Sequence, residues 1–216
     1  MNGLIVFLQE RGGTIGECMF QHVRLTVVAM LLAILVAVPA GLGLTRTPRL
    51  ARISMGLMSI IQTMPSLALV GLMVPIIGAG PRAAILALFL YALLPICRNT
   101  YTGIRSVDPA SIETAKAMGM TSAQILLRVE LPLSVPTILA GIRTSTVICV
   151  GIATLGGIIG AGGLGHLIWI GIDRANDSLI YAGAVPAMAL ALCLDGLLAL
   201  SERALSPPGT GTETES

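Results

Sequence analysis

The residues that most often carry out chemistry are few in this chain, and their spacing fits none of the common catalytic motifs. Lys116 is the only lysine, and it stands between Ala115 and Ala117 rather than in a glycine-rich phosphate-binding loop. The two histidines, His22 and His166, are far apart, and neither belongs to an H-E-x-x-H zinc motif. No G-x-S-x-G motif is present either. We therefore expect no catalytic residue, no bound cofactor and no metal site in this chain.

Cysteine and glycine residues have structural interpretations. None of the four cysteines falls in a C-x-x-C pair, which argues against a zinc or disulfide framework and favours buried apolar side chains. The glycine run 160–165 follows a long apolar segment rather than a strand. We expect it to end a helix and form a turn, since glycine accepts positive φ, and not to bind a nucleotide.

Two opposite charges stand inside apolar segments. Arg143 lies about seven residues into one segment, and Asp195 about five residues from the end of another, so their depths are similar at about 1.5 Å per helical residue. An isolated charge at such a depth is unfavourable. We predict that Arg143 and Asp195 pair across two helices; the alternative is that each side chain extends separately to the interface.

Neutral polar residues in the apolar segments could line a passage. Gln62, Thr63 and Ser66 surround Pro65, where helical hydrogen bonding is interrupted. Thr144, Thr146 and Thr154 offer hydroxyls in a segment rich in small residues. We predict that Gln62, Thr63, Ser66, Thr144 and Thr146 face a translocation pathway. Packing and hydrogen bonding between helices is the alternative.

The composition indicates a membrane protein. Hydrophobic residues make up 55% of the 216 residues and charged residues only 11%, against about 25% charged in soluble domains. A net charge of +2 is too small to indicate nucleic-acid binding. The predicted fold class is all-α, with lipid as the surrounding solvent.

Five apolar segments are candidates for membrane-spanning helices, which need about 20 residues each. Prolines interrupt several of them, which is tolerable where neighbouring helices satisfy the freed carbonyls. We predict one transmembrane domain over residues 1–204 and a disordered polar tail over 205–216. The predicted spans are residues 25–44, 53–77 (broken by Pro65 and Pro75), 83–97 (ending near Pro95), 137–159 and 179–200.

The basic residues predict the orientation. If the N-terminus lies outside, nine of the 13 basic residues face the cytoplasm and four do not. We therefore predict a multi-pass protein of a bacterial cytoplasmic (inner) membrane with its C-terminus inside. This orientation places the polar segment 98–136, hereafter the elbow, in the cytoplasm.

The elbow carries the signals of a helical hairpin. Asp108 is a suitable N-cap and Pro109 a suitable first helical residue, while Gly119 suits the position just after a helix. Thr121 and Gln124 form a T-x-x-Q capping box that starts a second helix. Pro132 and Pro136 are expected to stop that helix before the fourth span.

The spacing in the elbow resembles a signature of permeases of ATP-binding-cassette (ABC) importers: E-A-A, three residues, Gly, nine residues, I-x-L-P. Here Glu113, Thr114 and Ala115 are followed by Gly119, and then by the segment V-E-L-P that ends in Leu131 and Pro132. The departures are threonine for alanine at 114 and valine for isoleucine at 129. Most of the rest of the chain resembles the permeases of the osmoprotectant (glycine betaine/carnitine/choline) importers, notably IIQTMPSLALVGLMVPIIG, PICRNTYTGIRSV and GAGGLGHLIWIG.

This resemblance implies the small type I importer fold, with the elbow as a coupling-helix hairpin that contacts a separate ATPase dimer. ATP and Mg would then bind to the ATPase and not to this chain. A second permease copy or a related permease, an extracytoplasmic substrate-binding protein and membrane lipid are the other expected partners. The implied coupling residues are Glu113, Thr114, Ala115, Gly119, Met120, Leu131 and Pro132.

Other classes of membrane protein remain as alternatives. Methionine-importer permeases share the elbow, the length and the glycine-rich region, although the segment from Gln62 to Ser66 resembles the osmoprotectant group more closely. A self-contained secondary transporter would need its own ion sites, often in an internal repeat, and no repeat is evident. A membrane enzyme is disfavoured because no catalytic constellation is present.

Overall fold

The computed structural model describes residues 2–205, with side chains from Gly12 onward, and within that range helices joined by short turns are the only regular secondary structure. The all-α prediction is confirmed. The predicted tail, 205–216, lies outside the described residues except for Leu205. Nine α-helices are described: α1 (Asn2–Leu44), α2 (Pro48–Thr63), α3 (Ser66–Ile77), α4 (Pro81–Arg105), α5 (Pro109–Ala117), α6 (Ser122–Ile125), α7 (Leu131–Ala153), α8 (Leu164–Asp173) and α9 (Asp177–Leu205). A π-helical segment (Leu126–Glu130) joins α6 to α7, and a 3₁₀ segment (Thr154–Ile159) follows α7.

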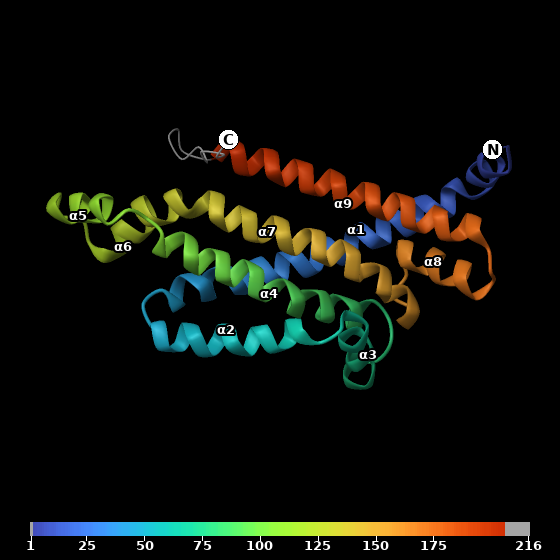
Figure 1. Cartoon of the computed structure of the whole chain (residues 1–216), viewed down its shortest axis with the longest axis horizontal. Helices are drawn as coiled ribbons and strands as arrows, with labels where there is room; N and C mark the ends of the chain where they lie inside the picture. The colour runs from blue at the N-terminus through green and yellow to red at the C-terminus, as the bar shows by residue number, and fades with distance from the viewer. Residues whose placement is uncertain (1, 206–216) are drawn as a thin grey trace, which may run out of the picture.

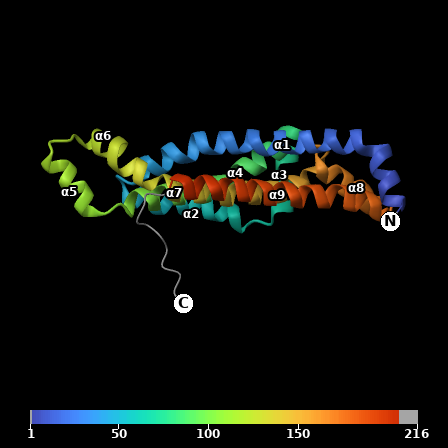
Figure 2. The same ribbon diagram turned by 90° about the horizontal axis from the view of Figure 1, so that it is seen from above.

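Helix α4 lies at the centre of an elongated bundle (Figure 1). It packs against α1 and α7 along most of its length and against α2 and α3 on another side, while α9 packs on α7 and α8. The elbow helices α5 and α6 project beyond the bundle at one end, and α8 and the start of α1 lie at the other (Figures 1 and 2). Helix α9 runs back toward the elbow, so its last residues lie on the elbow side of the bundle.

Small residues allow α4 to approach its neighbours closely. A Cβ atom added at Gly141 of α7 would lie 2.8 Å from the Pro95 carbonyl oxygen, and one added at Gly41 of α1 would lie 2.9 Å from that of Cys97. Ser145 of α7 donates a hydrogen bond to the Ala92 carbonyl at 3.1 Å. Much of the small-residue content of α7 is therefore used for packing and hydrogen bonding between helices.

Four helices, α1, α4, α7 with its flanking segments, and α9, are long and apolar enough to cross a membrane. A fifth crossing is possible if α2 and α3 are counted together, although the two are bent by 99°. The predicted span 53–77 is therefore two helices, because Met64 and Pro65 both adopt extended backbone conformations. The break expected at Pro75 is absent, since α3 continues to Ile77.

Two predicted helix ends are wrong. Helix α4 continues through Pro95 to Arg105 instead of ending near residue 97. Pro132 and Pro136 do not stop the second elbow helix, because α6, the π-helical segment and α7 follow one another without a loop. The π turn, in which the Leu131 N–H binds the Leu126 carbonyl, widens the backbone just before Pro132. That widening accommodates a proline ring that would otherwise clash with the preceding turn.

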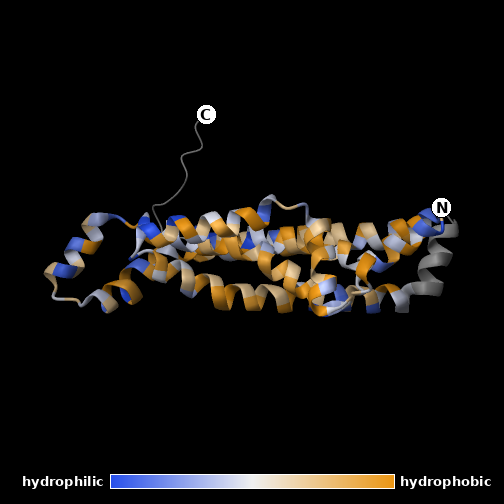
Figure 3. Cartoon of the chain, turned by 90° about the horizontal axis from the view of Figure 1, so that it is seen from below, coloured by the Kyte–Doolittle hydropathy of each residue, from blue (hydrophilic) through white to orange (hydrophobic). Residues whose placement is uncertain are grey.

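Apolar residues predominate along the helices of the bundle, whereas polar residues are more frequent in the elbow (Figure 3), and many large apolar side chains of the bundle are exposed. In a soluble monomer an exposed apolar surface of this extent would be unusual. Lipid or partner subunits are therefore expected to cover these faces. Exposed examples are Leu31 and Leu35 on α1, Ile53, Leu57 and Ile60 on α2, and Met188, Leu192 and Leu197 on α9.

Candidate functional site

The first elbow helix begins and ends as its local sequence predicts. The Asp108 carboxylate accepts a hydrogen bond from the Ala110 N–H at 3.0 Å, and Pro109 occupies the first turn. At the other end, the Gly119 N–H binds the Lys116 carbonyl at 2.9 Å and the Met120 N–H binds the Ala115 carbonyl at 3.1 Å. This pair of bonds is a Schellman motif, which requires the φ of +77° that Gly119 adopts.

The second elbow helix starts at the predicted capping box. The Gln124 side chain accepts a hydrogen bond from the Thr121 N–H at 2.8 Å, and the Thr121 hydroxyl accepts one from the Gln124 N–H at 3.4 Å. The backbone N–H groups of Thr121 and Gln124 are thereby satisfied without any contact outside the elbow. The hairpin is accordingly specified by local interactions.

The elbow presents a mixed surface to its surroundings. Glu113 and Thr114 are exposed, whereas Ala115 and Ile125 are buried. Two large apolar side chains, Met118 and Leu127, are 69% and 62% exposed on a segment that projects beyond the bundle (Figure 2). Exposed apolar residues beside a charged one, on a structured projection, are typical of a protein-docking surface.

The base of the elbow holds a buried carboxylate that sequence reasoning missed. Glu130 is the second residue of the V-E-L-P segment. It is followed by Leu131, which is half-buried, and by Pro132, which is exposed. Its Oε2 atom lies 3.6 Å from Nη2 of Arg46, which belongs to the turn between α1 and α2. The sequence did contain one signal for this buried carboxylate, since Glu130 is a single acidic residue among apolar residues just before a predicted span.

The structure brings together the two opposite charges of the apolar helices α7 and α9, whose pairing the sequence predicts. Arg143 of α7 binds Asp195 of α9 in a bidentate manner, with Nε–Oδ1 at 2.6 Å and Nη2–Oδ2 at 2.8 Å. Both side chains remain about one-third exposed. Glu202, which sequence reasoning missed, approaches Arg143 Nη1 at 3.6 Å. Because Glu202 follows Asp195 by two helical turns, the spacing alone would place both acids on one face of α9.

Gln62 is engaged in holding two helices together. Its Nε2 donates to the Tyr91 carbonyl at 3.0 Å. Pro95, four residues after Tyr91, has no N–H, so this carbonyl lacks its usual helical donor. In return, the Tyr91 hydroxyl donates to the Met64 carbonyl, beside the break between α2 and α3. The two bonds satisfy carbonyls at both proline interruptions and support the interhelical interpretation of Gln62.

The remaining pathway candidates do not converge on one cavity. Thr63 is exposed and donates to Ile60 within its own helix, and Thr146 is buried and donates to Ile142. Ser66 is half-buried at the start of α3. Thr144 is exposed and lines a cavity of about 370 Å³ between α7 and α9. The other residues lining that cavity are Ala140, Arg143, Val147, Ile148, Asp195 and Glu202.

Replacing Gln62 with leucine is expected to destabilise the protein. The Tyr91 carbonyl would lose its donor in a partly buried place, which costs about 1–3 kcal/mol. Thr63→Val is the matched control, since Thr63 is exposed and bonds only within α2; a change within about 0.5 kcal/mol is expected. Thermal unfolding of both variants in detergent measures the difference. Equal stability of Gln62→Leu and the parent would contradict the structural role of this side chain.

At the end opposite the elbow, the glycine run forms the predicted turn. Gly160, Gly162 and Gly163 all have positive φ, between 73° and 80°. Gln21 of α1 holds this turn, since its Oε1 accepts from the Gly163 N–H at 3.0 Å. The next residue, His22, is fully buried and joins α1 to α7, with Nε2 3.1 Å from the Val150 carbonyl. Neither contact was predicted, since both join residues far apart in the sequence.

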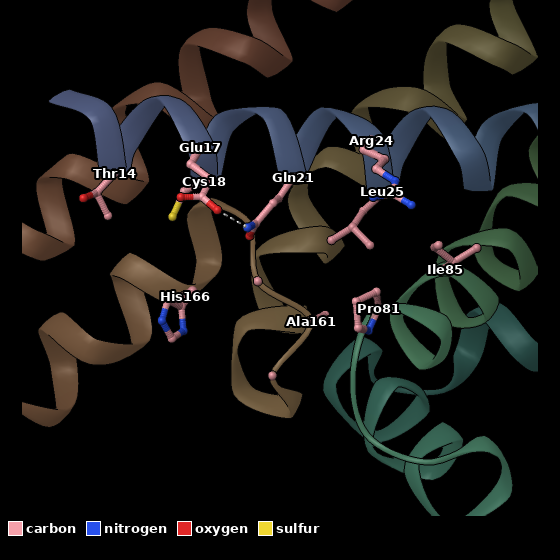
Figure 4. A pocket seen from close by; sticks show the side chains of 12 residues that line it. Thr14, Glu17, Cys18, Gln21, Arg24, Leu25, Pro81, Ile85, Ala161 and His166 are labelled. Atoms are coloured by element: carbon pink, nitrogen blue, oxygen red, sulfur yellow. Dashed lines mark hydrogen bonds between the residues drawn. The ribbon is translucent and has the colours of Figure 1, made fainter. Parts of the chain in front are cut away.

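A cavity of about 630 Å³ lies beside this turn, between α1, α4 and α8 (Figure 4). Glu17 and Gln21 point into it from α1 and share a hydrogen bond of 3.4 Å, and His166 faces them from α8. Arg24 and Thr14 also line it. The described residues thus line one cavity beside the glycine turn and another between α7 and α9.

Comparisons with known proteins agree with this geometry. Residues 29–207 match the family described as the inner membrane component of binding-protein-dependent transport systems. The choline transport system permease protein OpuBB of Bacillus subtilis (strain 168) is 46% identical over 209 residues, covering 97% of this chain and 96% of the relative. The glycine betaine/carnitine/choline transport system permease protein OpuCB of the same organism is 44% identical with the same coverage. A structure of the MetNI methionine ABC transporter in an inward-facing conformation superimposes with a TM-score of 0.76 and 25% identity, covering 87% of this chain and 94% of that one.

Proposed function

Because the chain belongs to the family of inner membrane components of binding-protein-dependent transport systems, we propose that it carries a small quaternary ammonium solute, such as glycine betaine, choline or carnitine, into the cell. It is an ABC importer permease with the type I fold. The solute class rests on the two relatives at 44–46% identity, whose names specify choline, glycine betaine and carnitine.

The proposed coupling to an ATPase is based on the structure of the elbow. It is a locally specified hairpin that projects from the bundle and exposes Met118, Leu127 and Glu113. We propose that it docks on one subunit of an ATPase dimer, with Glu113, Thr114, Ala115, Gly119, Met120, Leu131 and Pro132 forming or supporting the contact. ATP and Mg would bind to that dimer, and this chain would be a non-catalytic subunit.

The proposed orientation puts the elbow and the end of α9 in the cytoplasm and the N-terminus outside. The excess of arginine near the elbow end supports it: Arg46, Arg49, Arg52, Arg98, Arg105, Arg128 and Arg203 are all on or near that side. The substrate-binding protein would then meet the end that carries the glycine turn. A second permease copy or a related permease would cover part of the exposed apolar surface and complete the passage.

We further propose that the solute passes along the face of α7 that carries Thr144. Thr144 lines the cavity beside Arg143 and Asp195, whose charged side chains are about one-third exposed and would be unfavourable in contact with lipid. Gln62 then serves to hold α2 against α4, and Thr63 and Ser66, on α2 and α3, lie outside this cavity.

Methionine is the alternative solute, because the superimposed structure is that of a methionine ABC transporter. The lower identity, 25% against 44–46%, favours a quaternary ammonium solute. A secondary transporter is disfavoured by membership of a binding-protein-dependent family.

The test is uptake by the complete complex, reconstituted with its ATPase and binding protein in vesicles. Radiolabelled glycine betaine, choline, carnitine and methionine are supplied separately, with and without ATP. We expect ATP-dependent uptake of at least one quaternary ammonium solute and none of methionine. ATP-dependent uptake of methionine alone would overturn the solute assignment, and uptake without any ATPase would overturn the importer itself.

A further inference from the structure

A carboxylate is buried at the base of the elbow, where the π-helical segment joins α7. Glu130 is 9% exposed, and its Oε2 has no hydrogen-bond donor among the residues whose side chains are described. A buried carboxylate is strongly unfavourable unless a cation compensates it. Glu130 therefore depends on whichever cation comes close to it.

That cation comes from a different part of the bundle. Arg46 Nη2 lies 3.6 Å from Glu130 Oε2, which is an ion pair without a hydrogen bond. Arg46 sits in the short turn between α1 and α2, which backbone bonds hold: its own N–H binds the Gly43 carbonyl, and the Thr47 N–H binds that of Leu44. The ion pair therefore joins the base of the elbow to a well-defined turn between two other helices, α1 and α2.

The surroundings of Glu130 allow movement. Its five-residue π-helical segment departs from regular α-helix, a feature that is frequent at functional sites. A cavity of about 280 Å³ adjoins the carboxylate, lined also by Arg46, Arg105 and Ile112. Helix α7 is continuous with the elbow and would follow it directly, whereas α2 packs mainly on α4 and does not adjoin the elbow in the sequence.

We propose that Glu130 is a positioning residue that transmits movement of the elbow, through its ion pair with Arg46, to the turn between α1 and α2. The bent pair α2–α3 then moves together with α7 when the elbow is displaced. Because the pair is partly shielded from water, its attraction is stronger than that of a fully solvated pair and resists separation. The inference rests on the proposed function, since the ATPase supplies the displacement.

The experiment uses the complete complex in vesicles and measures solute imported per ATP hydrolysed. The variants are Glu130→Gln, Arg46→Gln and the reversed pair Arg46→Glu/Glu130→Lys. Arg49→Gln is the matched control, since Arg49 is exposed three residues further along and has no ion pair within the described residues. Co-purification of the ATPase reports assembly. Each single variant is expected to keep its ATPase and to lower the import-to-hydrolysis ratio about tenfold, because the ion pair that joins the elbow to the turn between α1 and α2 is lost.

The reversed pair should recover at least half of the lost coupling, and Arg49→Gln should match the parent. Unchanged coupling in Arg46→Gln, whose side chain is 55% exposed and not needed for the core, would overturn the proposal even if Glu130→Gln failed to assemble. A reversed pair no better than the single variants would overturn it too. Absence of uptake by the parent complex would instead be a failure of the proposed function.

Discussion

Gly119→Val is expected to abolish most solute uptake while leaving the permease in the membrane. Gly119 has a φ of +77°, and a Cβ at this position would meet no atom within 4 Å, so the obstacle is the backbone conformation and not a clash. Holding a non-glycine residue in the left-handed region costs about 1–3 kcal/mol, with β-branched residues at the upper end. The Schellman bonds of Gly119 and Met120 would open, and the elbow would no longer present its surface to the ATPase.

Gly119→Asn is the matched control, since asparagine tolerates the left-handed region far better than valine. We expect uptake by Gly119→Val to fall at least tenfold, which corresponds to about 1.4 kcal/mol of backbone strain. Uptake by Gly119→Asn should stay within about threefold of the parent. ATPase co-purification and uptake are measured side by side. If both substitutions reduced uptake equally, the left-handed conformation would not be the reason for glycine here.

Arg143→Leu is expected to be the most damaging single change within the bundle. It removes the guanidinium that binds Asp195 at 2.6 and 2.8 Å and approaches Glu202 at 3.6 Å, and so leaves two carboxylates on one face of α9 without this cation. Asp195→Asn is expected to be milder, because Arg143 keeps Glu202 as a partner. The double variant Arg143→Leu/Asp195→Leu should recover part of the loss, since paired charges can often be replaced together by apolar residues.

The measurement is the yield of monodisperse protein after extraction, followed by uptake of the reconstituted complex. The expected order of yield is parent, Asp195→Asn, the double variant and then Arg143→Leu, with roughly a tenfold range. If Asp195→Asn lowered the yield as much as Arg143→Leu, Glu202 alone would not be a sufficient partner for Arg143. Normal yield but absent uptake in all three would indicate a pathway role without a structural one.

The parts of the site that were predictable depend on neighbours in the sequence. The Asp108 cap, the Schellman motif at Gly119 and the capping box of Thr121 and Gln124 all use bonds that span two to five residues. The Arg143–Asp195 pair was predictable for another reason: two opposite charges in apolar segments have few other partners at that depth. Proline was the unreliable signal, because its missing N–H can be compensated from outside the helix.

The sequence by itself determined the membrane class, the hairpin and the spacing that marks the coupling elbow, because composition and local hydrogen bonds do not depend on how helices assemble. Only the tertiary structure decided that α4 continues through Pro95, since the amide that satisfies Tyr91 comes from Gln62 on another helix. It also decided the 99° bend between α2 and α3, the third member Glu202 of the intramembrane cluster and the contact of Glu130 with Arg46. These features arise from packing between distant segments, where the partner of each polar group is chosen by proximity in space.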